Sequence, residues 1–252
     1  MSDIELLALH GLAVKKAGGA GAVAAVLGRG EDEVAAALEG AVAAGQAIGA
    51  KGTFMVTPAG RAWLAERYPD AYADFRADPE AGAAYERFER INRELLALFT
   101  DWQMMPSAGG ERIPNDHADE RYDHAIIDRL GALHERAERN LERFAQLDPR
   151  LAVYEQRLDD AYDRVLAGDN DFVSGARVDS YHTVWFELHE DLLRMLGRER
   201  RSRARPRPDR RGRRAGRCGR TRVRSARGSS GKSGRRPTGG PGPPRPRRSY
   251  RG

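Results

Sequence analysis

The chain has 252 residues, of which 40% are hydrophobic and 32% charged, and its formal net charge is +6. This average combines two opposite parts: residues 198–252 hold 22 basic and 2 acidic residues, whereas residues 1–197 carry a net charge of −14. The basic total therefore does not predict a nucleic-acid-binding fold, because the part that can fold is acidic.

Cysteine content and apolar runs restrict the compartment and the chemistry. Cys218 is the only cysteine and lies in the basic part, so residues 1–197 hold neither disulfides nor thiolate metal sites. The N-terminus is acidic and lacks the apolar core of a signal peptide. No run approaches the roughly 18 apolar residues that span a bilayer. These features predict a cytoplasmic protein without a membrane partner.

Residues 1–68 predict three helices, a hairpin and a further helix. The first helix ends at Gly18-Gly19, the second covers about 20–27, and the third runs from near Glu31 to about Gly45. Two short strands are expected around Lys51-Gly52. Thr57 and Pro58 then open a helix that reaches about Tyr68, with proline at its first position.

This order is that of a winged helix-turn-helix. The stretch Phe54-Met55-Val56-Thr57-Pro58-Ala59-Gly60-Arg61 resembles the wing-to-helix segment of MarR- and PadR-like regulators. That resemblance implies sequence-specific DNA binding through the third helix. The chain also looks like winged-helix proteins associated with phosphoenolpyruvate-utilising phosphotransferases, although no single motif is diagnostic of them.

The third helix departs from the pattern of a DNA-reading helix. Base recognition needs basic, amide or hydroxyl side chains on its exposed face, but its polar residues are all acidic before Gln46. This favours a winged helix that docks a protein partner, with DNA binding as the alternative. The basic residues that could still line one surface and contact DNA are Lys15, Lys16, Arg29, Lys51 and Arg61.

Residues 83–197 predict a helical domain after a linker at 69–82 that contains Pro69 and Pro79. Apolar residues at spacings of three and four indicate amphipathic helices at about 83–103, 119–147, 149–167 and 177–197. Four helices with one apolar stripe each predict a four-helix bundle or a close relative.

Histidines and carboxylates in this domain form a candidate ligand site. Asp179 and His182 are three apart on one predicted helix, and a histidine from elsewhere could join them. His182 and His189 are about 10 Å apart along a helix, too far to share one ion. The usual Glu-x-x-His repeat is absent, so capping and core-edge hydrogen bonds explain most of these residues more simply. The candidate residues are Asp101, Asp116, His117, His134, Asp179, His182 and His189.

Residues 198–252 are rich in Arg, Pro and Gly and predict a disordered tail. Three readings remain open: an arm that binds phosphate backbones, an inert tail, and the product of a frameshift or read-through. The abrupt change in composition favours the third. The run Gly228–Ser233 lacks the first glycine of a phosphate loop and the strand and helix that such a loop needs.

The sequence thus predicts a mainly α protein: a winged helix (1–68), a linker (69–82), a helical bundle (83–197) and a basic tail (198–252). Nucleophilic catalysis has no support, because the chain has no nucleophile elbow, no glycine-rich phosphate loop and no cysteine in residues 1–197. We therefore expect a non-enzymatic regulatory protein without a cofactor, whose partner is another protein or a second copy. The alternatives are a MarR/PadR-like transcriptional regulator, and a bundle that binds a ligand or a metal ion.

Overall fold

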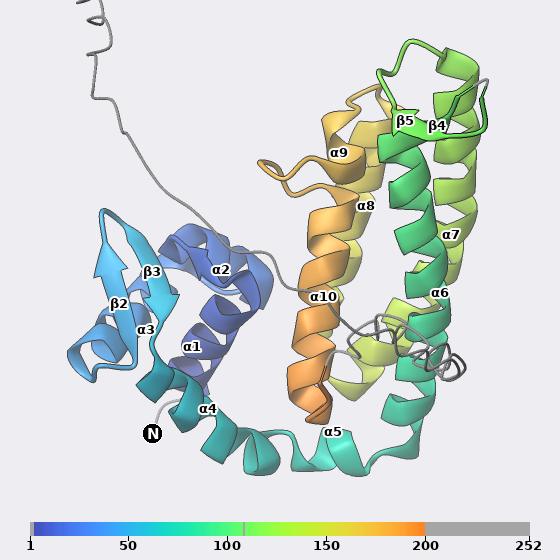
Figure 1. Ribbon diagram of the computed structural model, residues 1–252. Coiled ribbons are helices and arrows are strands. Elements are labelled where there is room, and N and C mark those ends of the chain that lie inside the picture. The colour runs from blue at the N-terminus through green and yellow to red at the C-terminus, as the bar shows by residue number, and fades with distance from the viewer. Residues whose placement is uncertain (1–2, 108, 200–252) are drawn as a thin grey trace, which may run out of the picture. The chain divides into compact units, whose positions relative to one another are not determined.

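The computed structural model describes residues 3–107 and 109–199, which are mainly helical with a small antiparallel sheet. Figure 1 shows their helices and strands in chain order. None of the described helices is long and apolar enough to cross a lipid bilayer. The predictions for the tail beyond residue 199, including Cys218 and the run at 228–233, fall outside the described residues.

The N-terminal unit, residues 3–71, contains the helices and the hairpin that the sequence predicts. Its three-stranded antiparallel sheet has the order β1-β3-β2, and the edge strand β1 was not expected from the sequence. The elements are α1 (Asp3–Lys15), β1 (Ala17–Gly18), α2 (Ala20–Leu27), α3 (Glu31–Ala43), β2 (Ala47–Ala50), β3 (Thr53–Val56) and α4 (Pro58–Ala71).

The β2–β3 hairpin turns through two residues with positive φ, Lys51 at 51° and Gly52 at 76°. Two central residues of this conformation match the right-handed twist of the flanking strands. The register places Ile48 opposite Met55 on one face, and Gly49 opposite Phe54 on the other. The predicted hairpin is thus confirmed, and its two faces present different side chains.

The start of α4 explains why Thr57, Pro58 and Gly60 follow the hairpin. The Thr57 hydroxyl accepts a hydrogen bond from the backbone amide of Gly60 at 3.0 Å, and Pro58 occupies the first turn. A Cβ on Gly60 would lie 2.0 Å from the carbonyl oxygen of Gln46. The same oxygen accepts a hydrogen bond from the backbone amide of Thr57 at 2.9 Å. This bond holds the start of α4 against the backbone of Gln46, so only glycine fits at position 60.

Residues 69–82, expected to be a linker, are largely helical. Helix α4 continues through Pro69 to Ala71, α5 covers Ala73–Ala77, and α6 begins at Pro79. The Asp78 carboxylate caps α6 by accepting the amide of Glu80 at 2.7 Å, and proline needs no partner in a first helical turn. Pro79 opens α6 and Pro69 is accommodated within α4, so these residues are helical where a linker was predicted.

The helical unit, residues 79–197, contains four long helices that share one apolar core. Figure 1 shows α6, α7, α8 and α10 running alongside one another. Its elements are α6 (Pro79–Gln103), β4 (Met104–Pro106), β5 (Arg112–Pro114), α7 (Glu120–Leu147), a 3₁₀ turn (Pro149–Leu151), α8 (Ala152–Leu166), α9 (Asp171–Ser174) and α10 (Tyr181–Leu196). The four predicted helices are therefore present, with shifted ends.

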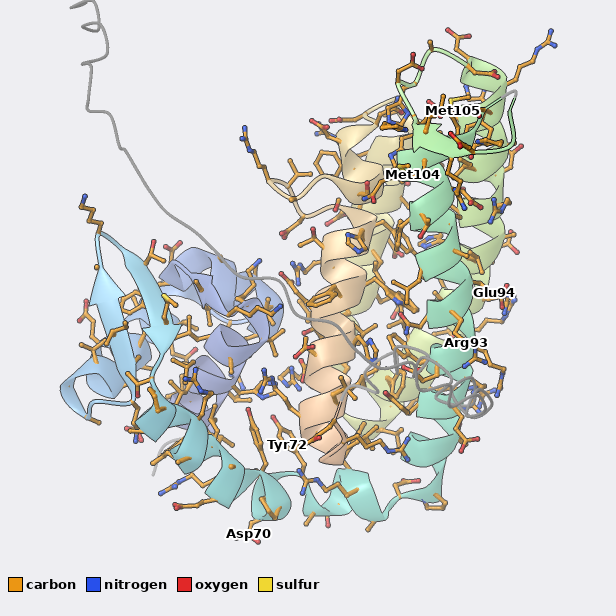
Figure 2. The ribbon with its side chains drawn as sticks, in the orientation of Figure 1. Asp70, Tyr72, Arg93, Glu94, Met104 and Met105 are labelled. Carbon is orange, nitrogen blue, oxygen red and sulfur yellow. The ribbon has the colours of Figure 1, made fainter. Side chains whose placement is uncertain are left out.

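Side-chain caps set two of these ends. Asp119 accepts the amides of Arg121 and Tyr122 at the start of α7, and Ser180 accepts the amide of Thr183 at the start of α10. Because Ser180 is the cap, α10 begins four residues later than predicted. The β4–β5 hairpin lies between the helices predicted at 83–103 and 119–147, and its two strands were not expected from the sequence. Met104 and Met105, labelled in Figure 2, belong to its first strand.

The N-terminal unit packs on the helical unit through α1. Helix α1 contacts α10, and α2 contacts α8. Leu9 and Leu12 of α1 are fully buried and belong to the same core cluster as the long helices. The two units therefore share a continuous core, and the residues between them are part of the folded body.

Candidate functional site

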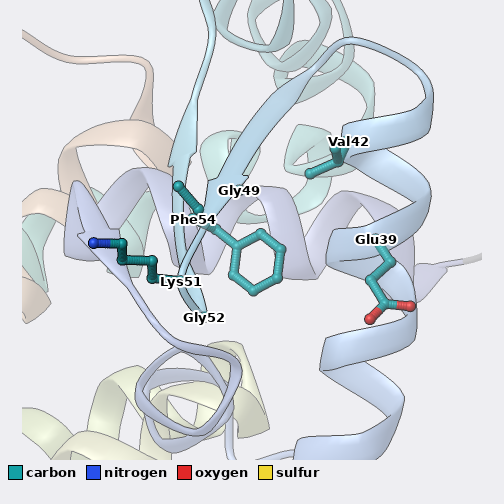
Figure 3. A pocket seen from close by; sticks show the side chains of 7 residues that line it. Glu39, Val42, Gly49, Lys51, Gly52 and Phe54 are labelled. Carbon is teal, nitrogen blue, oxygen red and sulfur yellow. The ribbon is translucent and has the colours of Figure 1, made fainter.

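A pocket between α3 and the β2–β3 hairpin combines apolar and charged side chains. Its volume is about 290 Å³, and Val42 and Phe54 supply its apolar part. Figure 3 shows the Phe54 ring between the hairpin and α3, with Glu39 and Val42 on the helix. The pocket is lined by Glu39, Val42, Gly49, Ala50, Lys51, Gly52 and Phe54, and we call it the α3–hairpin pocket.

The charge on α3 is entirely negative. Glu31, Asp32 and Glu33 lie in its first turn, where carboxylates stabilise the helix through its dipole. Glu39 lies two turns further on and is exposed, so the helix dipole does not explain it. Val42 is 38% exposed beside it. This helix therefore presents a carboxylate next to an apolar surface, without a basic or amide side chain for reading DNA bases.

Three of the five predicted DNA contacts are already engaged within the protein. The Lys15 ammonium lies 2.7 Å from Glu187, Lys16 lies 4.7 Å from the centre of the Phe186 ring, and Arg61 donates to the Val56 carbonyl at 3.0 Å.

The other two are exposed: Arg29 after α2 and Lys51 at the hairpin turn. Lys15 and Lys16 face α10, so the five side chains do not form one basic surface.

A buried polar cluster joins the two units. His10 of α1 and Asp191 of α10 are both 0% exposed, and His10 Nε2 lies 2.8 Å from Asp191 Oδ1. Arg150 donates to both oxygens of Asp191 at 2.6 and 2.9 Å, and Tyr154 donates to Oδ2 at 2.8 Å. His10 Nδ1 lies 3.0 Å from the Tyr68 hydroxyl. We call His10, Tyr68, Arg150, Tyr154 and Asp191 the His10–Asp191 cluster.

Electrostatics fixes the protonation states in this cluster. Burial opposes the ionisation of Asp191, but the charge of Arg150 and the contact with His10 hold its pKa well below the usual range. Burial lowers the pKa of His10 despite the attraction of Asp191, so the imidazole is neutral. A neutral ring that donates from Nε2 and accepts at Nδ1 satisfies both neighbours. Because no member reaches solvent freely, the cluster positions the two units and offers no access to a substrate.

The predicted ligand residues do not form one site. Asp101 at the end of α6 binds Arg112 and Arg129 at 2.6 and 2.9 Å; burial opposes its ionisation, but these hydrogen bonds lower its pKa. Asp116 accepts the amide of Ala118 in the loop before α7.

His117 has a φ of 59° and contacts the Asp123 carboxylate at 2.8 Å. Its ring also packs on Trp102, with 4.5 Å between the ring centres. These contacts fasten the β4–β5 region to the ends of α6 and α7.

The remaining candidates have separate partners. Asp179 is half exposed and lies 2.9 Å from Arg157. His182 packs on Phe99, with 4.7 Å between the ring centres, and burial lowers its pKa. His189 lies 2.9 Å from Glu89. The expected cooperation between Asp179 and His182 is therefore not supported by their contacts.

His134 is the exception, because it lies among carboxylates from two helices. Its Nε2 is 3.6 Å from Glu138 on α7 and 3.6 Å from Asp159 on α8. Among the described residues, these three form the one group of histidine and carboxylate side chains close enough to share an ion. Burial raises the pKa of Asp159; His134 opposes this shift and Glu138 adds to it.

Two further carboxylates, Glu142 and Glu155, interact electrostatically with the group formed by His134, Glu138 and Asp159. Burial, followed by the charges of Asp159, Glu142 and Glu138, raises the pKa of Glu155. The sequence analysis identified His134 but missed Glu138 and Asp159. The spacing of four between His134 and Glu138 was visible in the sequence, whereas the approach of α8 was not.

Comparison of the chain with models of known protein families, with curated proteins and with solved structures finds no match. The resemblances noted from the sequence therefore depend only on the residues that carry them.

Proposed function

We propose that this protein is a non-enzymatic regulatory or interaction protein whose N-terminal unit is a winged helix that docks a protein partner. The helical unit, in this proposal, is a four-helix bundle that holds the winged helix in place. The partner inserts an apolar side chain between Val42 and Phe54 and places a basic side chain near Glu39.

The observation that carries this proposal is the α3–hairpin pocket. A hollow that combines an exposed apolar side chain, Val42, with a half-buried aromatic ring, Phe54, is typical of a binding surface. Glu39 beside it repels phosphates and attracts a basic protein segment. The ion pair between Lys15 and Glu187 of α10 also offsets one of the positive charges that a DNA-binding winged helix needs.

Site-specific photo-crosslinking in cells tests docking. A photoreactive residue replaces Val42, which is 38% exposed in the pocket, and in a matched chain it replaces Leu166, which is 60% exposed on α8. We expect one cross-linked protein species at position 42 and none at 166. Glu39→Lys replaces the attraction for the partner's basic side chain by a repulsion. The yield at position 42 should therefore fall at least about tenfold, which corresponds to a loss of about 1.4 kcal/mol of binding energy.

Equal products at both positions, or a yield insensitive to Glu39→Lys, would overturn the docking proposal. A second arm measures the alternative, a MarR/PadR-like regulator, by selecting duplexes from a random DNA library with the full chain and with residues 1–202. Docking predicts no enriched motif with residues 1–202. An enriched motif that survives physiological salt would establish sequence-specific DNA binding instead, because contacts to phosphates alone weaken steeply with salt.

A further inference from the structure

We propose that His134, Glu138 and Asp159 form a binding site for a divalent transition-metal ion of the zinc class. The site lies between α7 and α8 and is independent of the α3–hairpin pocket. His134 and Glu138 are four residues apart and therefore lie one above the other on one face of α7. Asp159 reaches the same point from α8, so one ion would connect the two helices.

The distances between the ligand atoms fit an ion. All three ligand atoms lie within 4.8 Å of one another, and Nε2 of His134 is 3.6 Å from each carboxylate oxygen. Two ligands at about 2.1 Å from a tetrahedral zinc ion are separated by about 3.4 Å. The two distances from His134 exceed this separation by a few tenths of an ångström, and the two carboxylate oxygens, which lie within 4.8 Å of each other, would approach by up to about 1.4 Å to complete the first coordination sphere.

One buried polar atom in this group, on Asp159, lacks a hydrogen-bond partner. The His134 side chain is 9% exposed, and its Nε2 is too far from either carboxylate oxygen for a hydrogen bond. Asp159 Oδ1 is buried and has no hydrogen-bond partner. Buried polar atoms without a partner are uncommon in native proteins, and an absent ion is one established explanation. A cation between His134 Nε2 and Asp159 Oδ1 would supply the partner that this carboxylate oxygen lacks.

The other ring nitrogen of His134 also suits metal binding. Its Nδ1 lies 3.3 Å from the hydroxyl of Tyr181, which is fully buried. For Nε2 to bind an ion, Nδ1 must carry the hydrogen and donate it to this hydroxyl oxygen. Histidines that bind metals usually donate their second ring hydrogen in this way, which fixes the orientation of the ring. Tyr181 is therefore a positioning residue for the proposed ligand.

Uncompensated negative charge favours a cation at this point. Glu142 and Glu155 act electrostatically on the same region as Glu138 and Asp159. Within the described part of the chain, no lysine or arginine forms an ion pair with any of these four carboxylates. Imidazole together with carboxylate oxygen is a ligand set for zinc, manganese, iron or cobalt ions. Water completes the coordination, since three protein ligands leave a position open.

Metal titration of the full-length chain tests the site. The protein is first stripped with a chelator, and Zn²⁺ binding is then measured by calorimetry, with Co²⁺ as a visible-absorption probe of the ligands. We expect one tightly bound ion per chain. His134→Gln and Glu138→Gln should each weaken it at least about tenfold, the lower end of the loss seen when even an outer-shell partner is removed.

Matched controls on the same helix keep the test specific. His124→Gln and Glu135→Gln replace exposed residues of α7 and should leave affinity and stoichiometry unchanged. Glu138 is 41% exposed, so its replacement preserves the fold even if His134→Gln does not. Failure to saturate near one ion, or equal loss with the control variants, would overturn the proposal. Because the pocket on α3 is not involved, this result is independent of the docking experiment.

Discussion

Replacement of Asp191 by asparagine should lower the free energy of unfolding by about 3 kcal/mol. The side chain keeps its size but loses its charge, and its amide group would face donors where the carboxylate now accepts four hydrogen bonds. The Arg150 side chain, 9% exposed, would remain buried with only the Asp148 carboxylate, 4.0 Å away, as its counter-charge. Removal of one partner from a buried ion pair costs about 3–5 kcal/mol, and asparagine retains one acceptor, which places the loss near the lower figure.

Asp179 supplies a matched control for this substitution. It also pairs with an arginine, Arg157, but it is 50% exposed, and Arg157 keeps a second partner in Glu187 at 2.8 Å. Asp179→Asn should therefore cost less than about 1 kcal/mol, the usual range for exposed pairs.

Urea unfolding, followed by far-UV circular dichroism and tryptophan fluorescence, measures both variants. Trp63 reports on the N-terminal unit, and Trp102 and Trp185 report on the helical unit. Asp191→Asn should lower the midpoint far more than Asp179→Asn does. A loss below about 1 kcal/mol, or one no larger than that of Asp179→Asn, would refute the assigned energetic role of the His10–Asp191 cluster.

Three further predictions follow from individual contacts. Tyr154→Phe should cost about 1.5–3 kcal/mol because it removes a hydrogen bond to a charged carboxylate, whereas Tyr72→Phe should be nearly neutral because the buried Tyr72 hydroxyl has no partner; urea midpoints measure both. Stability should fall as pH drops from about 7.5 to 5.5, through the unfolded-state pKa of histidine, because the lowered pKa of His10 means that the unfolded chain takes up the proton first. Gly60→Ala should unfold the N-terminal unit or shift α4, because its Cβ would lie 2.0 Å from a backbone oxygen; the fluorescence of Trp63 reports this change.

Their controls are equally specific. Equal losses of stability for Tyr154→Phe and Tyr72→Phe would contradict the hydrogen-bond assignment. Tyr72 lies just beyond the end of α4 and is labelled in Figure 2. His10→Gln should flatten the pH dependence, and an unchanged slope would exclude His10 as its source. Gly82→Ala on α6, where a Cβ meets nothing within 4 Å, should be neutral or stabilising. Wild-type stability of Gly60→Ala would show that the close approach to the backbone is relaxed in solution.

Local signals predicted the helices and the hairpin because those signals act over a few residues. Thr57 and Pro58 open α4 within one turn, and Lys51-Gly52 turns the hairpin through its own backbone angles. Pro69 and Pro79 misled the linker prediction, because proline is compatible with a helix at its first turn and was tolerated near the end of α4. Apolar periodicity predicted the four long helices for the same reason: each stripe is a property of one helix.

The His10–Asp191 cluster could not be predicted in this way, because it joins residues that no local spacing relates. A weak signal existed in the burial pattern. His10 interrupts the apolar run of α1 between Leu9 and Leu12, and Asp191 lies on the core side of α10 between Leu188 and Leu192. A charged or polar residue on a core face needs a partner. Only the packing of α1 against α10 shows that each residue is the partner of the other.

His10 and Asp191 are separated by 181 positions in the chain. A ribosome adding about 5–20 residues per second takes about 10–40 seconds to travel from one to the other. During that interval α1 has been synthesised but lacks α10, its polar contact and part of its apolar cover. Until α10 has been synthesised, the face of α1 that packs on it stays uncovered and His10 lacks its carboxylate partner, so the contact between the two units forms only at the end of translation.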